Sequence, residues 1–212
     1  MSAASSRALI RRGVLKGISN AYSSYRKMAG DPLHEAPEFF LAAHIAEELK
    51  QKAKPCWITL ESRIEEILKV AGAKGKGRAA KVVSYKGKFD IVLWYGVKGI
   101  PRAVIEVKHP VNVTSASRID KDVERICRVV RTSKSKGGSL KFGIFAFYTR
   151  ASDPKVKDKN ATARIRRRLK PIEQHCKSLA KEYGCTGTMH LSRVHRDGTD
   201  AWAACAVSIN AK

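Results

Sequence analysis

The sequence predicts an α/β protein in which helices flank a mixed β-sheet, and three observations lead to this prediction. Segments with apolar residues at helical spacing alternate with short apolar runs that are typical of strands. The chain has 212 residues, of which 43% are hydrophobic, and this is enough for one core of ordinary size. The sequence contains no internal repeat and no evident linker. A layered arrangement around a single sheet suits this order of segments.

The N-terminal segment is basic and has the pattern of a helix. Its first thirty residues contain six basic residues and no acidic one. Ile10, Val14 and Ile18 recur at helical spacing. We therefore predict a basic N-terminal arm or helix over residues 1–35 and a single domain over residues 36–212. We expect a cytoplasmic location; the alternative is that this amphipathic start directs import into mitochondria.

Two helices are predicted before the first strand. Residues 38–54 have apolar residues at helical spacing, and Pro55 favours a helix end before it. Residues 57–72 continue with the same spacing, and Gly72 is typical of a helix end. The glycines and lysines that follow predict a flexible basic loop.

The central segments predict strands and one helix. Strands are expected over residues 80–85, in the two apolar runs of residues 87–110, and over residues 141–150. Apolar residues recur at helical spacing over residues 115–136 and predict a helix there. The central order is therefore three strands, a helix and a fourth strand.

The C-terminal part predicts a helix and a hairpin. Residues 160–184 have a helical pattern in which Pro171 should cause a kink or a break. Residues 186–195 and 201–209 are two apolar runs separated by a turn-like sequence, which predicts two further strands.

Three charged residues interrupt the apolar strands of residues 87–110. If these strands form an antiparallel hairpin centred on Lys98, Asp90 and Glu106 lie opposite each other. Glu106 and Lys108 are two residues apart, so they project from the same face of their strand. Two facing carboxylates are costly in an apolar sheet unless a cation lies between them. Mg²⁺ would supply that charge, because it prefers oxygen ligands and is usually held by one or two carboxylates.

This stretch resembles the core of the PD-(D/E)xK nucleases, the restriction-endonuclease-like superfamily. The residues that carry the resemblance are "FDIVLW" and "AVIEVKH", although Phe89 stands where many members have proline. The resemblance implies that Asp90 and Glu106 hold Mg²⁺ or Mn²⁺, with the carbonyl of Val107 as a further ligand. It also implies that Lys108 helps to orient or deprotonate the attacking water, or balances charge on the phosphate.

The order of elements is similar to the same family over somewhat more than half of the chain. From about residue 36 to residue 150, the predicted order matches an α-β-β-β-α-β core. The resemblance thus implies a restriction-endonuclease-like mixed sheet flanked by helices, with an extra C-terminal helix and hairpin.

Many members of this family add a glutamate from the helix that precedes the first strand. Glu61 and Glu38 are the preferred candidates here, because each lies near the start of a predicted element and faces its apolar side. The other glutamates of the two early helices are expected to be solvated, and they are Glu47, Glu48, Glu65 and Glu66.

The net charge of +23 indicates a polyanionic partner, most often nucleic acid. Five basic residues occupy seven positions and form what we call the arginine cluster: Arg164, Arg166, Arg167, Arg168 and Lys170. Such a cluster fits contacts with a DNA backbone, and its alternative is a solvated helix face. Arg125 has two alternatives as well, a phosphate contact or a surface pair with Asp122.

We therefore expect a metal-dependent deoxyribonuclease that hydrolyses phosphodiester bonds in DNA, and the family resemblance allows a homodimer. The rival prediction is a nucleic-acid-binding protein that uses the same fold without turnover. No apolar run approaches the roughly 20 residues needed to span a bilayer, so we expect no membrane segment. The five cysteines are odd in number and lack a CxxC pair, which predicts reduced thiols.

Overall fold

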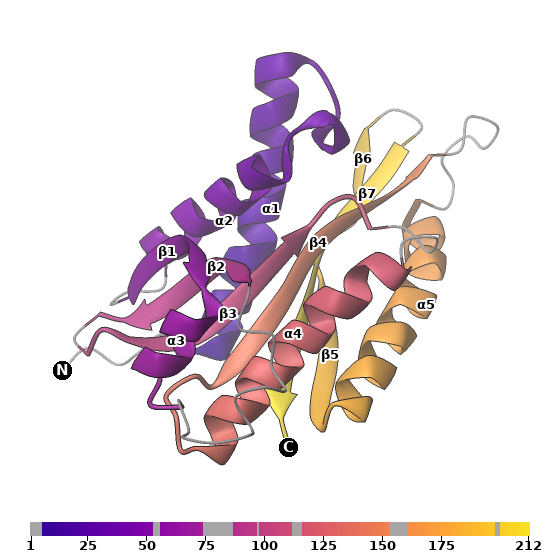
Figure 1. Cartoon of the computed structure of the whole chain (residues 1–212). Coiled ribbons are helices and arrows are strands. Elements are labelled where there is room, and N and C mark those ends of the chain that lie inside the picture. The colour runs from indigo at the N-terminus through magenta and orange to yellow at the C-terminus, as the bar shows by residue number, and fades with distance from the viewer. Residues whose placement is uncertain are drawn as a thin grey trace.

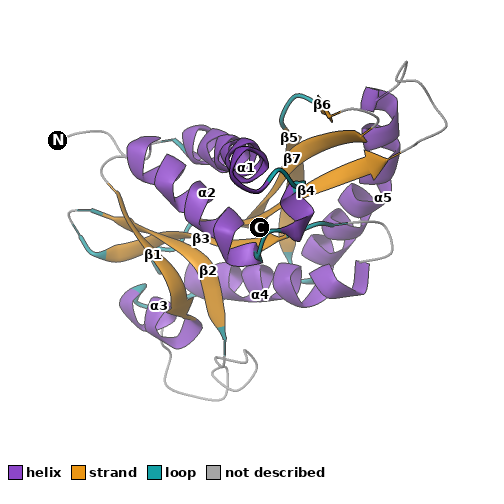
Figure 2. Cartoon of the chain, turned by 90° about the horizontal axis from the view of Figure 1, so that it is seen from above, coloured by secondary structure: helices purple, strands orange, loops and turns teal. Residues whose placement is uncertain are grey.

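A mixed β-sheet lies between two layers of helices in the computed structural model of this chain (Figures 1 and 2). The structure describes residues 6–52, 56–73, 87–96, 98–111, 116–152, 161–197 and 200–212. One face is covered by α1 (Arg7–Ala29) and α2 (Glu38–Lys52), which a short 3-10 helix (Leu33–Glu35) connects. The other face is covered by α3 (Ile64–Val70), α4 (Ala116–Ser135) and α5 (Ala161–Glu182).

The sheet has seven strands, and one neighbouring pair is parallel. The strands are β1 (Cys56–Arg63), β2 (Lys88–Tyr95), β3 (Ile100–Lys108), β4 (Phe142–Ser152), β5 (Cys185–Leu191), β6 (His195–Asp197) and β7 (Asp200–Ala211). Their order is β1-β2-β3-β4-β7-β5. Strand β6 pairs with the first residues of β7, and β5 pairs with the rest of that strand. The parallel pair is β3 and β4, which α4 connects as a crossover helix. The predicted class, a mixed sheet flanked by helices, is confirmed.

The register of the β2–β3 hairpin is also confirmed. Ile91 pairs with Ile105, and Leu93 pairs with Ala103, as expected for a hairpin centred near Lys98. Continued by one residue, this register puts Asp90 opposite Glu106. A shift in register occurs only closer to the turn, after Leu93, so it does not affect the charged end.

The predicted helix over residues 57–72 is wrong in its first half. Cys56–Arg63 form strand β1, which pairs with β2, and only Ile64–Val70 are helical. Exposed and half-buried residues alternate along β1, which is the period of a strand at the edge of a sheet. The strand predicted over residues 80–85 lies outside the described residues. Strand β1 therefore precedes β2 in the observed order.

The break predicted at Pro171 is wrong, because residues 161–182 form one helix. Leu169 and Ile172, on either side of the proline, are both buried in the apolar core. Packing of this face holds the helix together despite the missing backbone donor. The predicted strand over residues 186–195 is divided into β5 and β6, which both pair with β7.

Each face of the sheet has its own apolar cluster. Helix α1 contributes Ile10, Val14 and Ile18 to the cluster that it shares with α2 and the sheet. Gly17 allows α1 to approach α2, since a Cβ atom there would lie 2.6 Å from the Cα of Ile45. The other cluster contains four of the five cysteines, and all five are free and buried.

In the described ranges, no helix combines the length and the apolar character needed to cross a membrane.

Candidate active site

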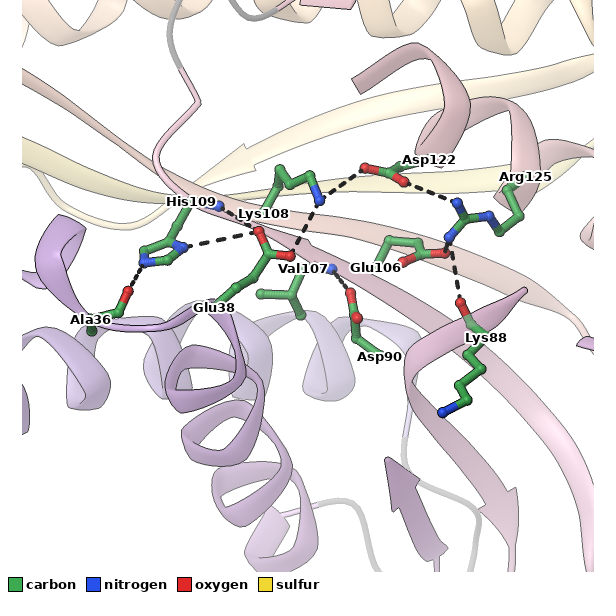
Figure 3. A network of polar contacts seen from close by, with 10 residues as sticks. All are labelled: Ala36, Glu38, Lys88, Asp90, Glu106, Val107, Lys108, His109, Asp122 and Arg125. Carbon is green, nitrogen blue, oxygen red and sulfur yellow. Dashed lines mark hydrogen bonds and ion pairs between the residues drawn. The ribbon is translucent and has the colours of Figure 1, made fainter. Parts of the chain in front are cut away.

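The charged residues of the β2–β3 hairpin meet side chains from both helical layers at one end of the sheet (Figure 3). Strand β2 begins at this end and strand β3 finishes there. Four elements supply the acidic and basic side chains, which are Glu38 of α2, Asp90 of β2, Glu106 and Lys108 of β3, and Asp122 and Arg125 of α4. These residues are referred to below as the charged cluster.

Asp90 takes the place of a backbone partner where the β2–β3 ladder ends. The last pair in the register is Ile91 and Ile105, and the next donor on that side of β3 is the N–H of Val107. This N–H donates a hydrogen bond of 2.6 Å to Asp90 Oδ2. The N–H and C=O groups of one strand residue point toward the same neighbouring strand, so the carbonyl of Val107 also faces the β2 side.

Asp90 and Glu106 are both difficult to ionise. Burial raises the pKa of Asp90, although the hydrogen bond from Val107 acts in the opposite direction. Burial and then the negative charge of Asp90 hold the pKa of Glu106 well above its usual range, and Arg125 opposes this shift. Glu106 is only 3% exposed. A cation close to both carboxylates would therefore be stabilised strongly by them.

Lys108 is held as a cation between two acids. Its Nζ atom lies 3.2 Å from Glu38 Oε1 and 3.7 Å from Asp122 Oδ2. Burial acts to lower the pKa of Lys108, but the charges of Asp122 and Glu38 outweigh burial and raise it. The amine is therefore protonated at neutral pH, so it can orient a water molecule or stabilise a phosphate but cannot act as a base there.

Glu38 joins the α2 layer to the end of β3. It is the first residue of α2, and its Oε2 atom accepts a hydrogen bond of 3.4 Å from the N–H of His109. Burial acts to raise its pKa, but hydrogen bonding to His109 and the charge of Lys108 lower it. Glu38 is therefore ionised and holds Lys108 in position.

Glu61, the other preferred glutamate, lies on β1 and is exposed. Leu60 pairs with Ile91 and Ser62 pairs with Phe89, so Glu61 lies across from Asp90. Its φ of 54° is unusual for a residue with a side chain and marks an irregularity in β1. Its carboxylate pairs with Lys88 Nζ at 3.5 Å, and its charge contributes to the raised pKa of Asp90.

One of the remaining glutamates is not solvated as expected. Glu48 is buried, accepts a hydrogen bond of 2.9 Å from Asn20 and pairs with Lys52 at 2.7 Å. It lies on the face of α2 that contacts α1. Glu47, Glu65 and Glu66 are exposed, as predicted.

Sequence reasoning missed Asp122 as a member of the charged cluster, whereas Arg125 is one of its candidates for a phosphate contact. Asp122 is 7% exposed, and its Oδ1 atom lies 3.4 Å from Arg125 Nη2. Arg125 also pairs with Glu106 through Nη1. The one local signal is that Asp122 precedes the buried Ile126 by four residues, which places the two on the same side of α4. Arg125 therefore supplies a positive charge to Glu106.

The site supplies some, but not all, of the oxygen ligands that a divalent cation needs. The carboxylates of Asp90 and Glu106 and the carbonyl of Val107 are donors of the kind that Mg²⁺ prefers. Among the described residues, no group of three or more His, Cys, Asp or Glu side chains is arranged to hold a metal ion. Water or substrate oxygens would have to complete the coordination. Arg125, moreover, already balances part of the charge of Glu106.

The arginine cluster divides between the two sides of α5. Arg164 is 8% exposed and lies on the buried side, so it does not face solvent as a phosphate contact would. Arg168 donates a hydrogen bond of 2.9 Å to the carbonyl of Arg150, which ties α5 to β4. The members that are exposed are Arg166, Arg167 and Lys170.

The exposed members of the arginine cluster lie toward the same end of the sheet as the charged cluster. Strands β3 and β4 are parallel, and Lys108 pairs with Phe147. Arg150, which Arg168 contacts, is three residues farther along β4 in the same direction. Both groups of charges are therefore found where β3 and β4 finish.

The fold and the site define an α/β protein with a buried pair of acids and a lysine at the end of its sheet. Comparison of the chain with protein-family models, with curated proteins and with solved structures found no match.

Proposed function

We propose that this protein is a metal-dependent deoxyribonuclease of the PD-(D/E)xK type, which hydrolyses phosphodiester bonds in DNA. The observation that carries the proposal is the meeting of Asp90, Glu106 and Lys108 at one end of the sheet. Burial raises the pKa of both acids, and a bound cation would stabilise their ionised forms. The net charge of +23 favours a polyanionic substrate.

Each residue of the charged cluster has a role in this proposal. Asp90 and Glu106 would hold Mg²⁺ or Mn²⁺ together with the carbonyl of Val107. The ion would polarise a phosphate oxygen and lower the pKa of a bound water. Lys108, as a cation, would orient that water and stabilise the negative charge that develops on the phosphate. Glu38 would act as a positioning residue for Lys108, because it holds the amine at 3.2 Å.

The exposed part of the arginine cluster would bind the DNA backbone. Arg166, Arg167 and Lys170 are directed to solvent at the end of the sheet where the charged cluster lies. Lysine and arginine contacts with phosphates supply affinity without reading the base sequence. Binding should therefore weaken strongly as the salt concentration rises.

Cleavage of plasmid DNA and single-stranded DNA in Mg²⁺ or Mn²⁺ tests the proposal. Asp90→Asn and Lys108→Met should each reduce cleavage by at least about 100-fold, because they remove a metal ligand and a charge that stabilises the transition state. Asp120→Asn is the matched control, since Asp120 of α4 pairs with His175 of α5 and not with a member of the charged cluster. It should cleave as the wild type does.

Two results would contradict the enzyme proposal. One is a wild-type protein that shows no metal-stimulated cleavage of either substrate. The other is equal cleavage by the wild type and by Asp90→Asn, which would point to a contaminating nuclease.

One observation favours the second candidate function, a nucleic-acid-binding protein without turnover. Arg125 pairs with Glu106 and so balances the buried acid without a metal ion. A metal titration separates the two functions, because a ligand that binds only the folded state raises the melting temperature. Mg²⁺ or Mn²⁺ should raise it for the wild type and for Asp120→Asn but not for Asp90→Asn. No shift in the wild type would favour the binding protein.

A further inference from the structure

Three rings are stacked on the α1 side of the sheet and are separate from the charged cluster. The indole of Trp202 lies 3.9 Å from the ring of Tyr22, centroid to centroid, at an interplanar angle of 16°. It lies 4.1 Å from the ring of His195 at an angle of 8°. Two rings this close and nearly parallel to the indole occupy opposite faces of it. Trp202 is therefore the middle ring of what we call the ring stack.

The ring stack lies between helix α1 and strand β6. Trp202 and Tyr22 are 4% and 9% exposed, and Tyr22 belongs to α1. His195 is paired directly with Trp202 across the β6–β7 ladder, which places the two side chains on the same face of the sheet. His195 is the outermost ring and is only half-buried. A planar ligand would lose little protein entropy on stacking there.

A cationic cavity opens beside the ring stack. It has a volume of about 370 Å³ and is lined by the three rings together with Ser23, Arg26, Lys27 and Arg196. Every charged side chain that lines it is basic. The volume is within the range of small-ligand sites, about 300 to 1,000 Å³. The cavity therefore offers a flat aromatic surface and a ring of positive charges.

The outer ring is neutral at physiological pH. Burial lowers the pKa of His195, and the nearby charges of Arg193 and Lys16 lower it further. A neutral imidazole can stack on an uncharged heterocycle, while the surrounding cations attract an anion attached to it. This division of roles fits a nucleotide, in which a planar base is joined to a phosphate.

The ring stack lies at the same end of the sheet as the charged cluster but on the opposite face. Trp202 pairs with Arg150 of β4, and Lys108 pairs with Phe147 of that strand. Two strand spacings and three residues separate Trp202 from Lys108, which is about 14 Å between Cα atoms. Trp202 belongs to the apolar cluster under α1, whereas Glu106 is directed toward α4. A strand that reaches both sites would pass around the end of the sheet.

We propose that the ring stack is a binding site for an unpaired base of a nucleic-acid strand, with the base on the outer face of His195 and its phosphates beside Lys27 and Arg196. The inference goes beyond the proposed function, but it rests on nucleic acid being the partner of this protein. Single-strand sites commonly combine aromatic platforms with a basic groove, and each base stacks without regard to its identity. The site would position the unpaired end of a substrate while the duplex or the scissile strand lies at the charged cluster.

Binding of a fluorescent oligothymidylate in EDTA tests this site by fluorescence anisotropy. His195→Ala should weaken binding by about 5- to 150-fold, which is the range expected for the loss of one base–aromatic stack. His195→Phe should remain within about twofold of the wild type, because it keeps a flat ring. An abasic strand of the same length should bind more weakly to the wild type and equally to the wild type and His195→Ala.

His190→Ala is the matched control. His190 is a partly buried histidine on strand β5, which also pairs with β7, and it contacts Arg11 at 3.2 Å. Among the residues that the structure describes, no ring is stacked on it. It should bind the oligothymidylate as the wild type does. Thermal melting checks that each variant is folded, and the comparison of the two strands on the wild type needs no variant at all.

Each of three results would overturn the proposal. The first is a wild type that binds the abasic strand as tightly as the oligothymidylate. The second is a folded His195→Ala variant that binds the oligothymidylate as the wild type does. The third is displacement of the strand by thymidine monophosphate at a concentration close to the dissociation constant of the strand. This result would assign the site to a free nucleotide.

Failure of this inference can be told apart from failure of the proposed function. The binding assay contains no metal ion and needs no cleavage, so base stacking can be found in a protein that is not a nuclease. Conversely, a protein that cleaves DNA but is unaffected by His195→Ala would retain the proposed function and lose only this site.

Discussion

Glu106 is the residue whose charge is hardest to accommodate in this protein. It lies on a central strand, is 3% exposed and faces the carboxylate of Asp90. Arg125 supplies the opposite charge from α4, and its other nitrogen, Nη2, lies 3.4 Å from Asp122. The cost of burying an ionised Glu106 is therefore offset by residues of one helix, α4. Removal of the arginine should reveal that cost.

Arg125→Gln should reduce the free energy of unfolding by about 3 kcal/mol at pH 8 in metal-free buffer, because it leaves a buried carboxylate without its partner. The loss should be smaller at pH 5. Glu106 has a pKa that is raised in the folded state, so the folded protein binds more protons than the unfolded chain and stability falls as pH rises above about 4.5. Urea denaturation at the two pH values measures both effects.

Arg128→Gln is the control for this prediction. Arg128 lies on the same helix, one turn away, and pairs with Glu124 through Nε at 2.6 Å. Since both side chains are partly exposed, its loss should cost less than about 1 kcal/mol and should show little dependence on pH. Equal losses for the two variants at both pH values would contradict a special role for Arg125.

The contact between α1 and α2 depends on two glycines that face different kinds of neighbour. A Cβ atom on Gly17 would lie 2.6 Å from the Cα of Ile45, which is backbone. A Cβ atom on Gly13 would lie 2.8 Å from Leu49 Cδ2, which is the end of a side chain that can rotate. The close approach of the helices is therefore limited by Gly17.

Gly17→Ala should lower the free energy of unfolding by about 2 kcal/mol, because the helices must separate to accommodate the methyl group. Gly13→Ala is the matched variant and should be close to neutral, since Leu49 can move and alanine is favoured over glycine in a helix by about 1 kcal/mol. Urea denaturation of the two proteins tests the prediction. A loss for Gly13→Ala as large as that for Gly17→Ala would show that the contact is limited elsewhere.

Two elements show where local pattern and tertiary structure disagree. The segment 56–63 has apolar residues that suit both a helix and a strand, and pairing with β2 decides for the strand. The segment 161–182 contains Pro171, which locally favours a break, but the burial of apolar residues on both sides of it keeps the helix continuous. In both cases contacts with the sheet outweigh the local preference.

At the scale of the whole molecule, the basic residues are not equivalent. The exposed members of the arginine cluster lie at the end of the sheet where β3 and β4 finish, with the charged cluster and the ring stack. Other exposed lysines lie toward the ends of α3, α4 and α5 where those helices finish, among them Lys69, Lys136 and Lys181. A polyanion that binds at the candidate site should contact the first group and not the second.

Salt dependence should distinguish the two groups. The association constant K for duplex DNA falls as the salt concentration rises. Replacement of Arg166, Arg167 and Lys170 by alanine should make the slope of log K against log[salt] less negative by about 2.7, since each phosphate contact contributes about 0.9. Anisotropy titrations in EDTA over a range of salt concentrations measure this slope. Replacement of Lys69, Lys136 and Lys181 by alanine is the matched control and should change it little. Equal changes in the two slopes would contradict a localised binding surface.

The sequence by itself determined the parts of this protein that depend on neighbouring residues. Local periodicity predicts the helices α1, α2 and α4. The short β2–β3 hairpin allows few alternative registers, so it also predicts that Asp90 lies opposite Glu106. The strand order β4-β7-β5, the entry of Asp122 and Arg125 into the site and the ring stack were decided by the tertiary structure. The physical reason is that these contacts join distant segments, so they depend on how apolar faces pack around the sheet.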